Sequence, residues 1–515
     1  MSWLQAQRSW NTLLVVAVFL VAGVIRFWNF TSLGYEHWDE VYFLTSADAV
    51  SKVWPHGLGS ISWAITPLIP YTDGTLFHFF GHNNWMPLGV SGVYGTLSAL
   101  LLYFLGSRLF GRAVGLIAAA VLATAIFSIT FSRMALADAT FDFWMIAAAL
   151  FVWLAFTRRR IGYWVLAGVC TGLLLNTKYT GVFPLLLAGS WVVVELVVDL
   201  VARRRQPVSK TVSEYLPQVM GVAAMAIVAL LMFAPWFLKL HHDPGFGVFI
   251  AHQQRFATQK TPADFIVWYY WIWTSPPTVL LAALGVVVGL FRFTRADRFL
   301  LIYTAGWFVA LMLFDAYPRE ALSLLPAVAI WAARAVVEVW KVLLGWRPKR
   351  RAIATAAAVV CAAAILLGQA LALPGVLSIR TDGYANAGAL ATRYQAAGSD
   401  VLISAQHQVF LYVSNGILLR PSRQVVQLLK ERPSTLVFMT DLTLVETPRV
   451  NAFFELNRDR LQVIARVPNG LYPEVYLQPA TTAKLSRLNN QPAAFQYITF
   501  WRVTGPLLYP PDWPK

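Results

Sequence analysis

Long apolar stretches separated by short polar loops dominate the first 375 residues of the chain. Each is about long enough to cross a hydrocarbon core of about 30 Å. The stretches lie near residues 9–30, 85–106, 113–132, 140–157, 161–177, 180–201, 216–238, 276–293, 298–315, 320–344 and 352–373. Because backbone polar groups in lipid must be hydrogen-bonded within the segment, we expect a polytopic α-helical membrane protein with about 11 transmembrane helices.

Basic residues fall in alternate loops and predict which loops share a side of the membrane. They gather at 108–112, 158–160, 203–210, 292–298 and 347–351. Since short cytoplasmic loops are rich in Lys and Arg, we expect these loops and the N-terminus inside. The loops expected outside are then 31–84, 133–138, the turn near 178, 239–275 and 315–319, with everything after 373.

Composition agrees with this class of protein. Hydrophobic residues make up 58% of the 515 residues and charged residues only 13%, about half the share of soluble domains. The net charge of +16 lies largely in the inner loops, so it orients the chain and gives no reason to expect nucleic acid. The stretch after Arg8 has no small-residue cleavage site and is expected to be a retained span. Cys170 and Cys361 lie in apolar runs and are expected to be packing residues.

The chain changes character after residue 375, where glycine, charge and short alternating segments replace the apolar runs. The pattern predicts strands at 401–405, 436–440 and 461–467 and helices at 384–397 and 422–431. We therefore expect two domains, a membrane domain over 1–375 and a small extracytoplasmic α/β domain over 376–515. The second domain has no Gly-rich phosphate loop, and we expect it to shape an acceptor site or to stabilise the bundle.

Two adjacent carboxylates, Asp39 and Glu40, stand in the first outer loop just after the first apolar stretch. Carboxylates beside a bilayer are costly to desolvate, so they indicate a functional site. The segment 41–53 that follows is amphipathic and is predicted to lie along the membrane interface as a helix.

Further charged residues stand in the other outer loops. Asp138 and Asp142 are four residues apart and share a helix face. Asp138 is interpreted as functional, whereas Asp142 is equally consistent with a structural pairing to Arg133. Lys178 is either a snorkelling anchor or a ligand for an anion, and Arg319 stands at the mouth of a later span.

These groups together predict a site for an anionic phosphate and a hydroxyl to be deprotonated. Arg suits bidentate phosphate contacts and Lys acts as a point charge. A carboxylate would take the proton from the acceptor. Burial would raise the pKa of such a carboxylate and the nearby cations would lower it, and the sequence leaves both directions open.

The motifs resemble those of the GT-C glycosyltransferases, and within them the protein O-mannosyltransferase and lipid A aminoarabinose transferase superfamily. The segments that carry the resemblance are 38–42, 132–143, 178–181 and 317–326, and it covers roughly residues 10–375. It implies inverting transfer of a sugar from a polyprenyl-phosphate donor to an acceptor hydroxyl on the outer face. At 83–88 the chain lacks the His-Pro-Pro-Leu of protein mannosyltransferases, so the acceptor is left as a glycan, a lipid or a protein.

The resemblance also implies roles for individual residues. Asp39 would be the general base, Glu40 would position it or bind substrate, and Asp138 would organise the catalytic site together with Arg133. The residues expected to bind substrate are Arg133, Lys178, Tyr179, Arg319, Tyr42 and Asp142, of which Lys178 and Arg319 would hold the lipid phosphate.

The loop 239–275 offers two further features. Some GT-C enzymes use a divalent metal, and His241, His242 and Asp243 are the candidate ligands, although loop histidines are more often solvated. The aromatic run at 268–273 is either an interfacial belt or a surface on which a sugar stacks.

Two other functions compete with the glycosyltransferase. A transporter or flippase of a lipid-linked sugar would place polar residues near the midplane and often carry internal repeats, whereas the acids here cluster at one face. A non-catalytic scaffold would leave Asp39, Glu40 and Asp138 unexplained. The enzyme is therefore the preferred interpretation.

Overall fold

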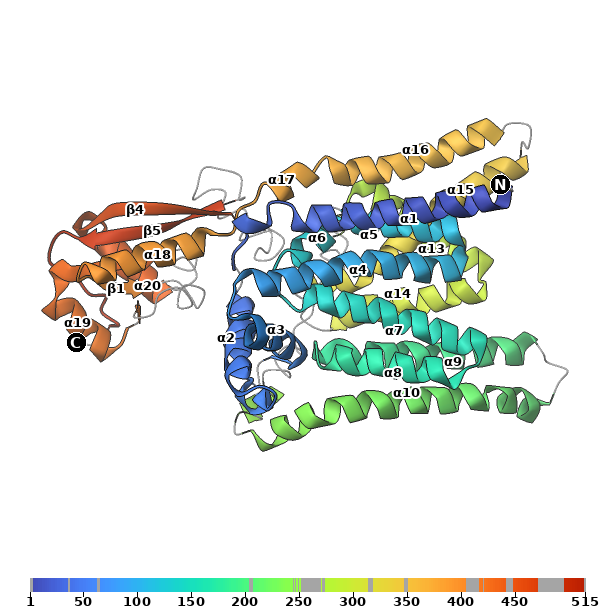
Figure 1. The fold of residues 1–515 in the computed structure, drawn as a ribbon, viewed down its shortest axis with the longest axis horizontal. Helices are drawn as coiled ribbons and strands as arrows, with labels where there is room; N and C mark the ends of the chain where they lie inside the picture. The colour runs from blue at the N-terminus through green and yellow to red at the C-terminus, as the bar shows by residue number, and fades with distance from the viewer. Residues whose placement is uncertain are drawn as a thin grey trace. The chain divides into compact units, whose positions relative to one another are not determined.

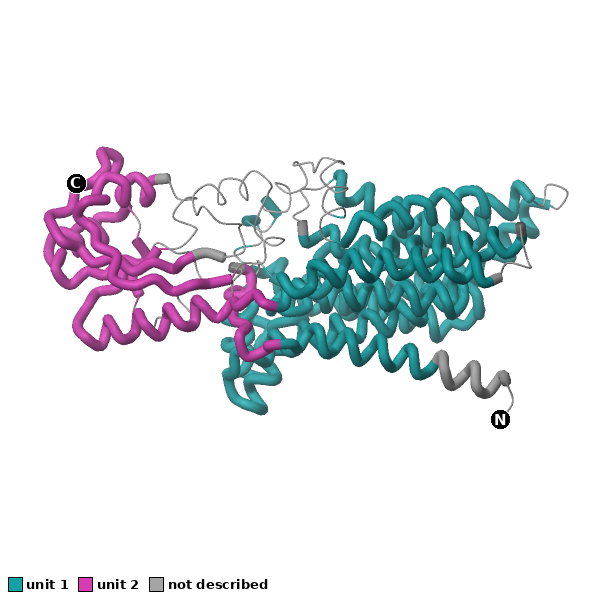
Figure 2. Tube along the Cα trace, turned by 90° about the horizontal axis from the view of Figure 1, so that it is seen from above, with its two compact units in different colours: residues 1–28, 43–377 teal, residues 29–42, 378–515 magenta. Residues whose placement is uncertain are grey.

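A computed structural model describes most of the chain as two compact units. The described residues are 3–35, 38–62, 65–202, 207–243, 245, 247–248, 250–251, 270, 274–313, 318–346, 351–403, 416–419, 421–440, 448–470 and 495–513. The first unit comprises residues 1–28 and 43–377, and the second comprises residues 29–42 and 378–515 (Figure 2). The segment 29–42, which includes the first residues of α2 (Trp38–Val53), therefore belongs with the C-terminal domain.

The first unit is a bundle of helices (Figure 1). Its elements are α1 (Trp3–Phe27), α2 (Trp38–Val53, which begins in the second unit), α3 (Leu68–Phe80), α4 (Trp85–Phe110), α5 (Arg112–Thr124), α6 (Ile126–Ser132), α7 (Asp138–Arg158), α8 (Ile161–Leu175), α9 (Phe183–Ala202), α10 (Val208–His242), α13 (Pro276–Arg292), α14 (Arg295–Leu313), α15 (Leu325–Trp346), α16 (Arg351–Ala370) and α17 (Leu373–Leu377). Short 3-10 turns η1 (Phe30–Ser32), η2 (Gly57–Ser60), η3 (Tyr179–Val182) and η4 (Pro318–Leu324) join them.

The predicted polytopic helical class is confirmed. Among the described residues, eight helices are long and apolar enough to cross a membrane, and the pair α5 and α6, bent by 58°, makes up to nine. The apolar helices α8 and α13 are shorter. Each of the eleven expected stretches coincides with one of these elements, while their number of crossings stays a prediction.

Burial identifies the centre of the bundle. In α7 and in the span that contains α15, 78% and 83% of the most apolar window is buried, against 11% in α16. Other helices therefore cover α7 and α15, which form the core of the unit, whereas α16 lies at its periphery. The acids at the start of α7 are therefore held by one of the two most enclosed helices among the described spans.

Loops that were expected outside meet at one end of the bundle. Lys239 Nζ donates to Ile61 O at 2.8 Å, which joins α10 to the first loop. Thr66 Oγ1 donates to Thr177 O at 2.5 Å, which joins the same loop to the turn before η3. These contacts bring together segments of the first, third and fourth loops that were expected outside, at an end of the bundle that we call the outer end after that expectation.

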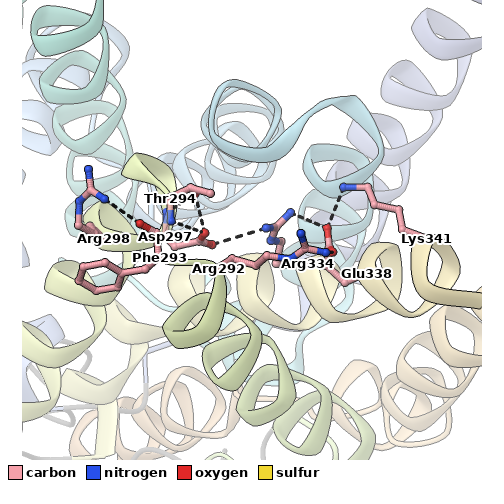
Figure 3. A network of polar contacts seen from close by, with 8 residues as sticks. All are labelled: Arg292, Phe293, Thr294, Asp297, Arg298, Arg334, Glu338 and Lys341. Carbon is pink, nitrogen blue, oxygen red and sulfur yellow. Dashed lines mark hydrogen bonds and ion pairs between the residues drawn. The ribbon is translucent and has the colours of Figure 1, made fainter. Parts of the chain in front are cut away.

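Ion pairs join α9, α13, α14 and α15 at the opposite end, where α14 begins. Figure 3 shows the part of this network formed by residues of α13, α14 and α15. The buried Glu195 carboxylate accepts from Arg298 Nε at 2.6 Å and from Arg295 Nε at 3.0 Å. Arg334 donates to Glu338 at 2.8 Å, and its guanidinium lies 3.7 Å from Asp297 Oδ1. The arginines of this end therefore compensate buried acids as well as marking the expected inner side.

We expect Glu195→Gln to destabilise the bundle. The substitution leaves the largely buried Arg298 without its carboxylate, and breaking a buried pair costs about 3 kcal/mol or more. A Tm lowered by several degrees in detergent would show this. Asp48→Asn is the control, because the exposed pair of Asp48 with Lys52 contributes about 1 kcal/mol at most; equal Tm values for the two variants would contradict the prediction.

The second unit contains a five-stranded sheet in the order β2-β1-β3-β5-β4. Its strands are β1 (Asp400–Ile403), β2 (Ile417–Leu418), β3 (Leu436–Thr440), β4 (Leu461–Gly470) and β5 (Phe495–Val503), and its helices are α18 (Gly383–Ala396), α19 (Arg423–Glu431) and α20 (Pro448–Leu456). β1 pairs in parallel with β2 and β3, and β5 is antiparallel to both β3 and β4. The small α/β domain predicted from the sequence is confirmed, whereas β2, β5 and α20 were not predicted.

Alternating side chains give this sheet an apolar layer on each face. Leu402 and Phe438 lie in one buried cluster with residues of α19 and α20. Val401 and Val437 lie in another with residues of α18. Because successive side chains of a strand point to opposite faces, the near-continuous apolar runs of β1 and β3 are those of strands covered on both sides.

Candidate functional site

The carboxylate pair lies in the first turn of α2, within the second unit. Asp39 is half-buried and Glu40 is fully buried, and Tyr42 follows, half-buried, one turn later. The N-terminus of a helix carries a partial positive charge, which favours ionised carboxylates there. The pair is therefore held at a place that stabilises its negative charge.

A partly buried lysine joins three elements at the outer end of the first unit. Lys178 Nζ lies 2.6 Å from Asp138 Oδ1, at the start of α7, and 3.1 Å from Glu320 Oε1, in η4. Arg319 Nε lies 3.8 Å from the same Glu320 oxygen. We call these four residues the lysine cluster. It brings together Asp138, Lys178 and Arg319, three of the residues predicted from the sequence.

Local structure explains how Lys178 reaches this position. The N–H groups of Thr177 and Lys178 both donate to Leu174 O at 2.8 Å, which ends α8 in a tight turn. The next turn is closed by Gly181, where a Cβ atom would lie 2.4 Å from backbone atoms of Leu174. Only glycine fits at such a distance, which accounts for the Lys-Tyr-Thr-Gly sequence of this turn.

Electrostatics keep Lys178 charged. Burial alone would lower the pKa of the ammonium, but the carboxylates of Asp138 and Glu320 outweigh burial and raise it. The ammonium also lies 5.7 Å from the centre of the Phe141 ring, a favourable cation–π distance. Lys178 is therefore a fixed positive charge at any physiological pH.

Two tyrosines position η4 and its charged residues. The hydroxyl of the buried Tyr270 donates to Ala321 O, and that of Tyr303 donates to Ser323 O at 2.9 Å. Ala321 follows Glu320 directly in sequence, and Ser323 lies two residues further on. The predicted residue Tyr179 is fixed from another side, since its hydroxyl accepts from Trp236 Nε1 at 3.2 Å.

Arg133 and Asp142 are both buried, but they lie in different surroundings. Arg133 Nη1 donates to the carbonyls of Arg26 and Trp28 at 3.2 and 2.6 Å, where α1 ends. Asp142 lies one turn beyond Asp138 on α7, and its Oδ1 has no hydrogen-bond partner in the part of the chain that the structure describes. Roles for both residues in substrate binding stay predictions.

The three candidate metal ligands lie at the end of α10. Asp243 Oδ2 lies 2.7 Å from Lys239 Nζ, and its Oδ1 accepts from Gly245 N–H at 2.8 Å. These contacts lower the pKa of the Asp243 carboxyl. His242 Nδ1 lies 2.7 Å from Leu238 O. No group of three metal-ligating side chains occurs among the described residues, metal use stays a prediction, and the aromatic run 268–273 lies outside them except for Tyr270.

Two acids of the outer end were not selected from the sequence. In the sequence Glu320 stands next to Arg319. Its position as an acid at the mouth of an apolar span was the feature that could have indicated a functional residue. Asp73 lies in α3 and is 1% exposed, with its Oδ1 lacking a hydrogen-bond partner in the described chain. Burial raises the pKa of the Asp73 carboxyl to about 8, so it is largely protonated at neutral pH.

Stability is expected to fall as pH rises because of Asp73. Its folded-state pKa of about 8 exceeds the ordinary value of 3.8, so the folded state holds a proton that the unfolded state has lost. Between about pH 4 and pH 8 this costs up to about 6 kcal/mol. In Asp73→Asn, which has no carboxyl group to titrate at this position, this fall in stability with rising pH is expected to be absent. Tm of the wild type and of Asp73→Asn, measured from pH 5 to 9, checks this prediction, with the exposed Asp48→Asn as control. Parallel curves of Tm against pH for wild type and Asp73→Asn would contradict it.

Comparisons with known proteins agree on one class. The family model described as dolichyl-phosphate-mannose-protein mannosyltransferase matches residues 64–238. An undecaprenyl phosphate-alpha-4-amino-4-deoxy-L-arabinose arabinosyl transferase of Erwinia tasmaniensis is 28% identical over 252 residues, 46% of this chain and 42% of the relative. A second such transferase, from Sodalis glossinidius, is 29% identical over 53% of this chain and 50% of its own length. The chain thus spans about half the length of the curated relatives it matches.

Solved structures show the same fold. ArnT from Cupriavidus metallidurans in the apo state has a TM-score of 0.55 at 15% identity, covering 96% of this chain and 98% of that one. The apo oligosaccharyltransferase of Archaeoglobus fulgidus has a TM-score of 0.62 at 14% identity, covering 88% and 71%. The chain therefore has the GT-C fold. These similarities point in the same direction as the resemblance of the sequence motifs, and the activity itself is taken up below as a proposal.

Proposed function

We propose that this protein transfers a sugar from a polyprenyl-phosphate donor to an acceptor hydroxyl at the outer face of the membrane. The observation that carries the proposal is the lysine cluster at the outer end of a GT-C fold. Relatives named as transferases use undecaprenyl phosphate derivatives, and the related ArnT structure is described as bound to undecaprenyl phosphate. The donor class follows from these two lines of support.

The lysine cluster is suited to an anionic leaving group. A lysine ammonium has three hydrogen-bond donors, and Asp138 and Glu320 occupy two of those on Lys178. In the part of the chain that the structure describes nothing occupies the third, so it can bind a phosphate oxygen, and the Lys178 side chain is 18% exposed. Asp138 and Glu320 hold the ammonium in place, and Arg319 adds a second cation. Developing negative charge on the phosphate would be stabilised here.

The reaction is an inverting displacement. The oxygen of the acceptor hydroxyl attacks the anomeric carbon while the bond from that carbon to the phosphate oxygen breaks. The polyprenyl phosphate leaves with the bonding electron pair, and Asp39 takes the proton from the acceptor hydroxyl as general base. Glu40, next to it in the same helical turn, positions Asp39 or binds substrate. A single displacement of this kind inverts the anomeric centre.

The proposed orientation follows from charge. The basic loops face the cytoplasm and place the N-terminus inside. The outer end, with the lysine cluster, and the C-terminal domain then face outward. The acceptor is a glycan, a lipid or a protein of the cell envelope. A resident divalent metal, with His241, His242 and Asp243 as ligands, is a second-rank expectation.

The direct test is transfer by the purified protein in detergent or liposomes. A panel of polyprenyl-phosphate sugars, including aminoarabinose, mannose and glucose, is offered with radiolabelled sugar and candidate acceptors. Transfer with inversion at the anomeric carbon supports the proposal. Movement of a labelled donor across liposomes without transfer would identify a flippase instead and overturn it.

A further inference from the structure

The segment that precedes the carboxylate pair is fixed to the start of the C-terminal domain by one threonine. Thr381 Oγ1 accepts from Gly34 N–H at 2.9 Å and donates to Gly34 O at 3.1 Å. The backbone N–H of Thr381 donates to Ser32 O at 3.1 Å. One side chain thus satisfies both backbone polar groups of a residue 347 positions away. We call Ser32, Gly34 and Thr381 the Thr381 clasp.

The Thr381 clasp is buried and closely packed. Thr381 is 1% exposed, and the neighbouring Tyr35 is equally buried. A Cβ atom at Gly34 would lie 2.6 Å from Thr381 O, so only glycine permits this approach of the two backbones. Buried hydrogen bonds to backbone groups are costly to break without replacement, and the segment 32–34 is therefore held in one position.

A second set of contacts joins the Thr381 clasp to the sheet. Gly470 N–H, at the end of β4, donates to Arg380 O at 2.6 Å. Gly383 N–H, at the start of α18, donates to Asn469 Oδ1 at 2.9 Å. Asn469 is fully buried. The residues 380–383 thus lie between the end of β4 and the segment 32–34, with hydrogen bonds on both sides.

We propose that Thr381 is a positioning residue for the Asp39–Glu40 pair, and that the C-terminal domain acts in the reaction through it. Asp39 stands five residues after Gly34 in sequence, and both belong to the compact unit of the C-terminal domain. The sheet would thereby set where α2 begins and how its first carboxylates are presented. The inference rests on the proposed function, in which Asp39 is the base.

Thr381→Val is the informative variant, because it keeps the shape of the side chain and removes both hydroxyl hydrogen bonds. We expect kcat to fall about tenfold to a hundredfold with KM values changed less than about threefold, as misplacement of a base by about 1 Å predicts. The pH at which kcat rises, as the general base loses its proton, is expected to shift. Amide hydrogen exchange of residues 29–35 is expected to be faster by about tenfold or more. Thr381→Ser, which keeps the hydroxyl, is expected to restore all three readouts.

Thr392→Val is the matched control. Thr392 lies in α18 of the same domain, and its hydroxyl donates to Gly388 O within the helix. This variant is expected to leave kcat, the pH profile and the exchange of 29–35 unchanged. Asn469→Ala, one contact further from Asp39, is expected to produce the changes of Thr381→Val at reduced size, and it serves if Thr381→Val does not fold.

Two results would overturn the inference. Faster exchange of 29–35 with kcat and pH profile unchanged would make the Thr381 clasp purely structural. Unchanged exchange in Thr381→Val would show that other contacts hold the segment. Failure of the proposed function is seen separately, as transfer that survives Asp39→Asn or as no transfer by the wild type with any donor.

Discussion

Asp39→Asn is expected to lower kcat for sugar transfer by at least about a hundredfold, with donor binding retained. General bases contribute about 10² to 10⁴ in rate, and the amide of Asn cannot accept a proton from the acceptor hydroxyl. The substitution keeps the size of the side chain in the first turn of α2. Single-turnover transfer with saturating donor, together with donor binding by wild type and variant, measures both quantities.

Asp48→Asn is the control for the Asp39 prediction. Asp48 lies further along the same helix and pairs with Lys52 at the surface, so its neutral variant is expected to transfer sugar at the wild-type rate. Transfer that survives in Asp39→Asn would remove Asp39 as the base. A parallel loss in Asp48→Asn would point to unfolding of α2 as the common cause.

Lys178→Met is expected to weaken donor binding by about tenfold to a hundredfold, the range for a hydrogen bond to a charged group. Its Nζ contacts two carboxylates, at 2.6 and 3.1 Å, so its loss also leaves the buried Asp138 uncompensated. We therefore expect a lower Tm as well. The double variant Lys178→Met with Asp138→Asn is expected to regain stability without regaining donor affinity, which separates the two effects.

Lys239→Met is the matched control for Lys178. Lys239 also lies near the outer end, pairs with Asp243 at 2.7 Å and is 15% exposed, against 18% for Lys178. Its variant is expected to bind the donor as the wild type does. Equal loss of donor affinity in both variants would show that net charge at the outer end, rather than the site of Lys178, governs binding. Recovery of affinity in the double variant would remove Lys178 as a phosphate ligand.

Much of the fold followed from the sequence because lipid restricts what can span it. All eleven apolar stretches coincide with helices or a bent pair of helices. In the C-terminal domain β3 has the predicted bounds, and α19 begins one residue after its predicted start, with Ser422 as its N-cap. β5 was missed because it pairs with β3 across a gap of more than 50 residues, which no local pattern reports.

The candidate site was predicted as a set of residues but not as a set of contacts. Asp138, Lys178 and Arg319 were selected because a charged side chain at the end of an apolar span is costly to desolvate and therefore indicates a functional site. Their arrangement around Glu320 depends on helix packing that joins positions 40 and 142 residues apart. Thr381 carried no signal at all, since a threonine that bonds to a distant glycine looks like any other threonine in a loop.

The buried Glu195 has a consequence for how the protein is made. Its arginine partners follow 100 and 103 residues later in the chain. At a synthesis rate of about 5 to 20 residues per second, α9 exists for roughly 5 to 20 seconds before α14 is made. During that interval the acid must remain at the aqueous boundary, because an unpaired charge resists entry into lipid. Assembly of the end of the bundle that holds Glu195 can therefore be completed only after α14 has been inserted.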